Sequence, residues 1–160
     1  MARVEPGEMA EGRIQVLTHH TEDAVWQQRW LAHPNRALGL ASLVIAVADV
    51  DEAAGRFSRF TSRPATRTRS GQCVQLDRGR IDLVTPNAFA AVLPELTIPS
   101  LPLMGAYGVM VTSLDAAEAT LRNGGISLRR VGDCLIVQFP HALGHGAWLF
   151  SASGQFSLFV

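Results

Sequence analysis

The residues best suited to acid–base chemistry are the histidines. His19 and His20 are adjacent on a segment predicted to be a strand, so their side chains point to opposite faces and cannot bind the same ion. His19 could act as a general base, because an imidazole gains or loses a proton near neutral pH. A surface histidine at the end of a strand is the alternative. His141 and His145 have the spacing of a helical ligand pair, but the neighbouring proline and glycines favour a loop between strands.

Arginine supplies all fourteen basic side chains, and seven of them lie between Arg56 and Arg80. Arg56, Arg59 and Arg63 recur at helical spacing, which is typical of a solvated stripe. Arg80 and Asp82 are two residues apart on a predicted strand, so their side chains share a face. Arg80 either pairs with Asp82 there or binds a carboxylate ligand.

The composition excludes several classes of protein. With no lysine, the chain has neither a Schiff-base nucleophile nor a Walker-type phosphate loop. Fourteen acids balance the fourteen bases, so we expect no binding to nucleic acid or to an anionic membrane. Cys73 and Cys134 lie in apolar runs, which indicates buried free thiols and a reducing cytoplasm. The N-terminus carries three acids and no apolar stretch, which is unlike a signal peptide, and the longest apolar run is too short to span a bilayer.

The chain contains an internal repeat. VIAVADVDEAAGRF (44–57) aligns with GVMVTSLDAAEATL (108–121), and RSGQCVQL from Arg69 aligns with RVGDCLIV from Arg130. Each copy predicts a strand, a helix with a capping residue at its start, and three short strands with glycine-containing turns. The repeated unit is therefore predicted to be β-α-β-β-β.

The repeat divides the chain into four parts. We expect an N-terminal strand and arm over 1–36, a first module over 37–86, a proline-rich linker over 87–102 and a second module over 103–160. GRIQVLT (12–18) also matches GRIDLVT (79–85) at four of seven positions. The N-terminal strand then looks like the closing strand of a partial module, unless the short match is coincidental.

The tandem repeat, with strand openings such as GLASLVIAVADVDEAA, resembles the vicinal oxygen chelate superfamily, which includes glyoxalase I, extradiol dioxygenases and bleomycin-resistance proteins. The resemblance covers residues 12–150. It implies an α+β fold in which tandem βαβββ modules form a curved mixed β-sheet around a cleft. In that superfamily the cleft holds a divalent metal in many enzymes and a bare ligand in others.

The metal positions of the superfamily can be followed onto this chain. Members commonly place a histidine early in each first strand and a glutamate in each last strand, and the corresponding positions here are Ser42, Ala106, Asp82 and Leu149. Asp82 alone is a strong ligand, and one carboxylate does not hold a metal ion. We therefore expect no metal and no other cofactor.

The same resemblance implies a set of site residues in the cleft. His19 and Asp82 are the catalytic candidates, since the partial repeat puts Gln15 and His19 on the face that carries Arg80 and Asp82. Trp26 and Trp30, one helical turn apart, either stack on an aromatic ligand or anchor the arm on a core or another subunit. The expected ligand-binding residues are Arg80, Gln15, Ser42, Trp30, Tyr107 and Trp148.

Three functions remain open. The first is a glyoxalase-like protein that binds or converts a small oxygenated or aromatic molecule without the usual metal; as an enzyme it would be a lyase or isomerase, or a dioxygenase relative. The second is a sequestering protein of the bleomycin-resistance type, and the third is a non-catalytic module of an oligomer. We expect a homodimer, because members of the superfamily often pair modules across a dimer and the N-terminal strand and tryptophan-bearing arm need apolar surface to cover.

Overall fold

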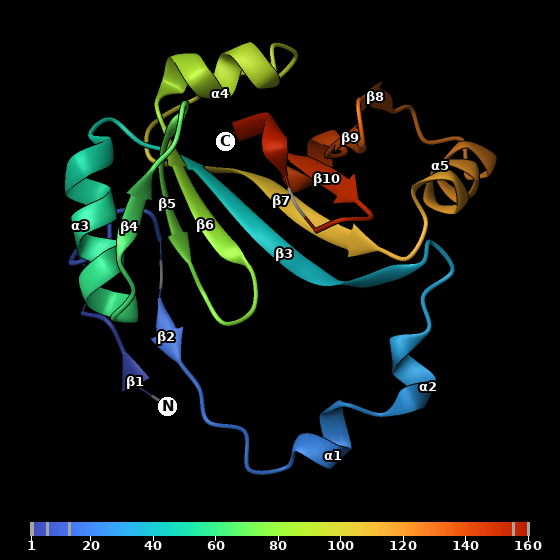
Figure 1. The fold of residues 1–160 in the computed structure, drawn as a ribbon, viewed down its shortest axis with the longest axis horizontal. Helices are drawn as coiled ribbons and strands as arrows, with labels where there is room; N and C mark the ends of the chain where they lie inside the picture. The colour runs from blue at the N-terminus through green and yellow to red at the C-terminus, as the bar shows by residue number, and fades with distance from the viewer. Residues whose placement is uncertain (1, 6, 13, 155, 160) are drawn as a thin grey trace.

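The computed structural model describes residues 2–5, 7–12, 14–154 and 156–159. Figure 1 shows a curved sheet with helices around it and an N-terminal arm that runs out from it. The sheet contains β3 (Ala37–Ala46), β4 (Ala65–Arg67), β5 (Gly71–Gln75), β6 (Arg80–Val84), β7 (Leu103–Val111), β8 (Arg129–Val131), β9 (Cys134–Gln138) and β10 (Ala147–Ser151). The helices are α1 (Glu22–Val25), α2 (Gln28–Leu31), α3 (Val50–Thr61), α4 (Pro86–Val92) and α5 (Leu114–Asn123), with single 3₁₀ turns η1 (His141–Leu143) and η2 (Ser157–Phe159).

The strand order is symmetric about the middle of the sheet. It runs β4-β5-β6-β3-β7-β10-β9-β8, with β3 and β7 antiparallel at the centre. β6 lies parallel to β3 on one side, and β10 lies parallel to β7 on the other. We call β3-α3-β4-β5-β6 module 1 and β7-α5-β8-β9-β10 module 2. The predicted α+β fold, with two βαβββ modules in one curved mixed sheet, is confirmed.

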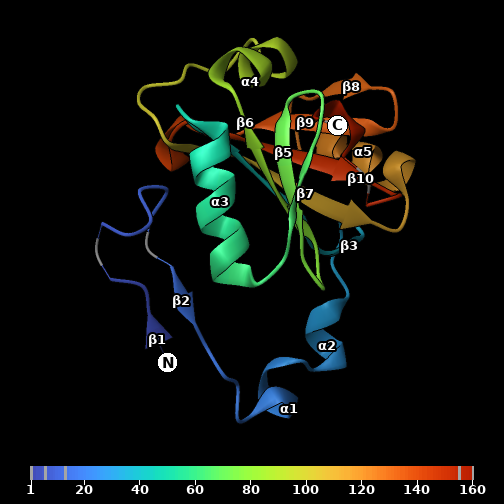
Figure 2. The ribbon, with the colours of Figure 1, turned by 60° about the vertical axis from the view of Figure 1, so that its left-hand side comes forward.

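Helices α3 and α5 cover the same face of their modules because the two copies begin alike. The Asp49 side chain accepts a hydrogen bond from the backbone N–H of Glu52 at 2.9 Å, and Ser113 Oγ accepts one from Ala116 at 3.2 Å. These are N-caps, which hold the first turn of each helix. The apolar side of α3, with Phe57 buried, then packs on the strands of module 1. Figure 2 shows α3 lying along these strands. We call this face of the sheet the outer face.

Side chains alternate along a strand, so the residues between those that meet α3 and α5 point to the opposite, inner face. The strand residues buried there are Val44, Ala46, Val84, Ala106, Cys134, Ile136, Ala147 and Leu149. They come from both modules and form one continuous core. The inner face is therefore where a cleft between the modules would lie.

The segment between the modules is not a bare linker. Pro86 begins α4, and Thr85 Oγ1 caps it by accepting a hydrogen bond from the backbone N–H of Ala88 at 3.1 Å. α4 lies over the inner face and buries Phe89 and, just beyond its end, Leu93. It contacts the C-terminal turn η2, which lies on the same face. Proline at the start of a helix is favourable, so the prolines here do not prevent a helix.

The described residues from Ala2 to Val16, which we call the N-terminal segment, pack on module 1, where Met9 is buried in the same core as Phe57. β1 (Ala2–Arg3) and β2 (Gln15–Val16) pair with each other in a separate two-stranded sheet. Between them the Glu11 carboxylate is buried against α3, where the Arg56 guanidinium donates to both of its oxygens at 2.6 Å. In the described part of the chain, no helix has the length and apolarity needed to cross a membrane.

Candidate functional site

A buried carboxylate forms the centre of the most polar part of the inner face. The Asp82 side chain is 1% exposed and accepts three hydrogen bonds. Ser42 Oγ donates to Oδ2 at 2.9 Å, while Arg80 Nε donates to Oδ2 at 2.9 Å and Arg80 Nη2 to Oδ1 at 2.6 Å. The register of β3 and β6 produces this contact, since Ser42 lies opposite Arg80 and Val44 opposite Asp82. The structure thus brings together three predicted site residues, and Arg80 makes the predicted pair with Asp82.

Cys73 completes this group from the next strand. β5 pairs with β6 so that Cys73 lies opposite Asp82. Burial raises the pKa of the Cys73 thiol, and the negative charge of Asp82 raises it further. A thiol kept protonated in this way is a poor nucleophile at neutral pH. We call Ser42, Cys73, Arg80 and Asp82 the Asp82 cluster.

The structure allows a direct test of whether the four superfamily metal positions fit a metal ion. They lie on the same inner face, because Ala106 and Leu149 of module 2 share that core with the residues around Ser42 and Asp82. Only Asp82 carries a charged donor, and both of its oxygens are held by the cationic Arg80. Among the described residues, no three His, Cys, Asp or Glu side chains come together as ligands, and no buried side-chain nitrogen or oxygen lacks a partner. This donor set does not fit a divalent metal.

The protein's own aromatic side chains fill the middle of the inner face. Three fully buried rings do this: Phe89 comes from α4, while Phe156 and Phe159 come from the described residues after β10, which we call the C-terminal segment. The rings of Phe89 and Phe159 stack with centroids 6.2 Å apart. Two glycines of β7 make room for these rings. A Cβ atom at Gly108 would lie 2.6 Å from the Phe156 ring, and one at Gly105 would lie 2.3 Å from the Phe89 ring. We call these three phenylalanines the aromatic plug.

Beside the plug an open groove of about 1050 Å³ remains at the end of β3. Its apolar wall includes Leu38, Leu40 and Met110, and Leu40 is 71% exposed. Its polar residues include Arg78, which is exposed, and Arg80. The remaining lining residues are Trp26, Gly39, Ala41, Gln75, Gly79, Ser153 and Gly154. None of the described lining residues is a histidine, cysteine or carboxylate.

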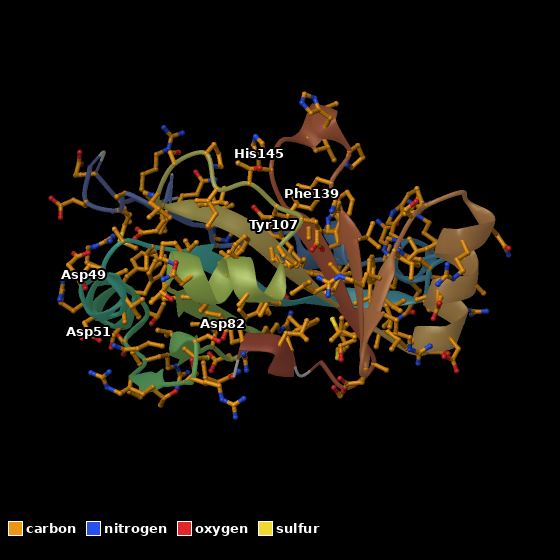
Figure 3. All side chains as sticks on the ribbon, turned by 90° about the horizontal axis from the view of Figure 1, so that it is seen from above. Asp49, Asp51, Asp82, Tyr107, Phe139 and His145 are labelled. Atoms are coloured by element: carbon orange, nitrogen blue, oxygen red, sulfur yellow. The ribbon has the colours of Figure 1, made fainter. Side chains whose placement is uncertain are left out.

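Two predicted ligand residues lie on the other side of the sheet. Tyr107 and Trp148 are opposite each other in the register of β7 and β10, and Trp148 packs against the outer-face core beside α5. Phe139, which sequence reasoning did not single out, lies 5.8 Å from Tyr107 and 4.4 Å from Trp148 between ring centroids. Figure 3 shows Tyr107, Phe139 and His145 grouped together, away from Asp82. The structure therefore corrects the placement of Tyr107 and Trp148 in the cleft.

The N-terminal candidates also lie apart from the Asp82 cluster. Gln15 is on β2, which does not join the eight-stranded sheet, and His19 follows it in an exposed segment. Trp30 on α2 is 60% exposed, with the Arg29 guanidinium 4.8 Å from its ring centroid, whereas Trp26 lines the groove. The partial repeat thus does not place Gln15 and His19 beside Arg80 and Asp82. The residues that sequence reasoning left out are Leu38, Leu40, Cys73, Phe89 and Phe156, and the glycine pattern of β7 is the only sequence signal for the plug.

Comparison with known proteins identifies the fold. No protein-family model matches the chain, and no curated protein matches its sequence. Among solved structures, methylmalonyl-CoA epimerase from Mycobacterium tuberculosis superposes with a TM-score of 0.58 at 17% identity, covering 78% of this chain and 94% of that one. The Streptomyces coelicolor methylmalonyl-CoA epimerase in complex with 2-nitronate-propionyl-CoA gives 0.53 at 13% identity, covering 72% and 96%. The chain therefore has the paired βαβββ fold of the vicinal oxygen chelate superfamily, to which these epimerases belong.

Proposed function

We propose that this protein binds a small, largely apolar molecule that carries a carboxylate or similar oxygen anion, in the groove beside Arg80 and without a metal. The observation that carries the proposal is the groove itself, whose volume of about 1050 Å³ is at the upper end of typical ligand sites. Leu38, Leu40 and Met110 supply an apolar wall. Arg78 supplies a cation, since no ion pair of its guanidinium occurs within the described part of the chain.

Binding is favoured over conversion by the chemistry of the lining. Proton transfer needs a carboxylate, imidazole, thiol or similar group within hydrogen-bond reach of the ligand. The groove lining in the described structure offers none, and both Asp82 oxygens are held by Arg80 and Ser42. His19 lies on an exposed segment outside the lining. The ligand class, a small acyl or aryl acid, rests on the apolar wall of the groove and on the cation of Arg78.

The test is calorimetric titration with 2-naphthoic acid, which combines an aromatic body with a carboxylate. Arg78→Met should weaken binding about 10-fold, because it removes a charge-assisted hydrogen bond. Leu40→Asn should also weaken it by making the apolar wall polar. Arg122→Met is the matched control, since Arg122 is an exposed arginine paired with Glu118 on α5. If neither the wild-type protein nor the variants gave a heat of binding, the proposal would be overturned.

A second candidate, a homodimer, is favoured by the unpaired edge of β3. β6 pairs only with Ser42–Ala46, so residues 37–41 of this central strand have no neighbouring strand on that side among the described residues. Leu38 and Leu40 are 57% and 71% exposed along this edge. The segment 12–18, whose sequence resembles the β6 strand that pairs with β3, makes a second copy of the chain the suitable occupant.

Sedimentation equilibrium tests the dimer. Leu40→Arg should shift the protein toward monomer, because a charge would be buried in the contact. Leu143→Arg is the control, since Leu143 is similarly exposed on η1 in the other module. A wild-type protein that stays monomeric at high concentration would contradict this candidate without affecting the ligand proposal.

A further inference from the structure

The aromatic plug covers two halves of the inner face that differ in chemistry. The registers of the central strands define equivalent positions, because Ser42 lies opposite Arg80 as Ala106 lies opposite Ala147. By the same register each residue of the Asp82 cluster has an apolar counterpart in module 2. Ser42 corresponds to Ala106, Arg80 to Ala147, Asp82 to Leu149 and Cys73 to Ile136. Module 2 shows that apolar residues suffice to build the floor under the plug. A buried ion pair costs desolvation energy that a purely structural core does not require.

The segment that covers this floor presents two chemical features to it. The Phe156 ring fills the recess that Gly108 leaves in β7. The Phe156 carbonyl oxygen accepts a hydrogen bond from Arg80 Nη2 at 3.4 Å, which is longer than the 2.6 and 2.9 Å bonds from Arg80 to Asp82. An aromatic ring joined to an oxygen acceptor is thus what the site holds, and the bond to the acceptor is weak.

Side chains, and not strand pairing, attach this segment to the rest of the protein. Sheet pairing ends at Ser151, and Gly154 then turns the chain with a φ of +68°. Beyond it lies the single 3₁₀ turn η2, held by the buried rings of Phe156 and Phe159. Gly154 and Ser153 also line the groove, so the segment begins where the groove ends. A short segment that is held by side chains and is not paired in the sheet can open without disturbing the strands.

We propose that the inner half of the cleft, over the Asp82 cluster, is a ligand site that the C-terminal segment occupies in place of the ligand. This inference rests on the proposed function and extends its site inward from the groove. The ligand's aromatic body replaces the Phe156 ring in the Gly108 recess, and its oxygen anion replaces the Phe156 carbonyl at Arg80 Nη2. The affinity measured on the full chain is then lowered by the fraction of molecules in which the segment is in place.

Hydrogen exchange on the wild-type full chain, with and without 2-naphthoic acid, tests the displacement. Bound ligands usually slow exchange, whereas displacement predicts faster exchange in the C-terminal peptide that carries Phe156 and Phe159, with slower exchange in β3 and β6. In calorimetry, Phe156→Ala should bind 2-naphthoic acid about 10-fold more tightly, because the competing ring is gone. Phe60→Ala, at a more exposed position on α3, should bind like the wild type.

The outcomes separate this inference from the proposed function. Equal binding by the wild type and Phe156→Ala, with slower exchange throughout, would leave the groove as a binding site and overturn the displacement. Weaker binding by a folded Phe156→Ala, shown as folded by circular dichroism, would overturn it too. Absence of binding by both proteins would overturn the proposed function itself. If Phe156→Ala does not fold, the exchange measurement on the wild type decides alone.

Discussion

The two modules share a chain path but differ in what each face carries. On the inner face, module 1 has the charged Asp82 cluster and module 2 has only apolar residues at the equivalent positions. On the outer face, module 1 is covered by α3 and the N-terminal segment. Module 2 is covered by α5, and there its Tyr107 and Trp148 rings contact Phe139. The duplication thus determines the arrangement of strands and helices, while the two copies differ in the chemistry of their side chains.

Module 2 makes the space and module 1 supplies the charge. Gly108 on β7 corresponds to Val44 on β3, and only the glycine leaves a recess for an aromatic ring. The groove also takes its cations, Arg78 and Arg80, from module 1, while Met110 and Ser153 come from module 2 and the residues after it. A site at the junction therefore needs both copies, but its polarity comes from one.

The largest expected effect comes from making module 1 resemble module 2 one residue at a time. Asp82→Leu leaves the Arg80 guanidinium largely buried without its carboxylate, so we expect the free energy of unfolding to fall by about 3–5 kcal/mol. Combining it with Ser42→Ala and Arg80→Ala, which copies module 2, should restore most of that loss. Urea unfolding followed by circular dichroism measures both.

The exposed Asp77→Leu, on the turn before β6, is the control and should change stability little. A triple variant as unstable as Asp82→Leu alone would show that module 1 needs its charges for packing. That result would break the comparison, because module 2 would then be a poor guide to what the floor requires.

The fold could be predicted from the sequence because both copies of the repeat keep the residues that determine the elements. The aligned segments place a capping residue, an apolar helix side and glycine turns in the same order twice, and the structure has these elements twice. Alternation along β3 and β6 also puts Ser42, Arg80 and Asp82 on one face, where the structure shows them in contact. Local pattern was sufficient wherever a strand's own periodicity decided the orientation.

The rest of the site depends on information that local pattern does not contain. Tyr107 and Trp148 each come directly after an inner-face residue, Ala106 and Ala147. Because side chains alternate along a strand, a position one residue further on lies on the outer face. Cys73 and Cys134 align in sequence, yet Cys73 lies opposite Asp82 whereas Ile136, not Cys134, lies opposite Leu149. The plug comes from α4 and the chain end, which lie outside the repeat and which only long-range packing brings to the inner face.

A medium effect is expected where the N-terminal segment meets module 1. Glu11→Ala removes a buried carboxylate that accepts two hydrogen bonds from Arg56, and we expect a loss of about 2 kcal/mol. Glu118→Ala breaks the corresponding contacts of α5 with Arg122 and Arg130 at the surface, where solvent screens the charges, and should cost much less. Thermal unfolding of both variants provides the comparison. Equal losses would show that the N-terminal segment adds nothing specific to module 1.

The smallest effect concerns the two thiols at high pH. Burial raises the pKa of the Cys134 thiol from its ordinary value of 9.0 to about 12. The unfolded chain therefore loses this proton first as pH rises, so its contribution to stability is intact at pH 8 and falls between about pH 9 and 12. At pH 10 the fall is about 1 kcal/mol in the free energy of unfolding.

Cys134→Val should flatten this part of the profile, measured by urea unfolding at pH 8 and 10. Cys73→Val should flatten it less, because Cys73 is less deeply buried than Cys134, at 6% against 2% exposed, and burial is the main cause of the raised pKa at both thiols. A steeper fall in Cys134→Val than in the wild type would show that the buried thiol of module 2 ionises in the folded protein.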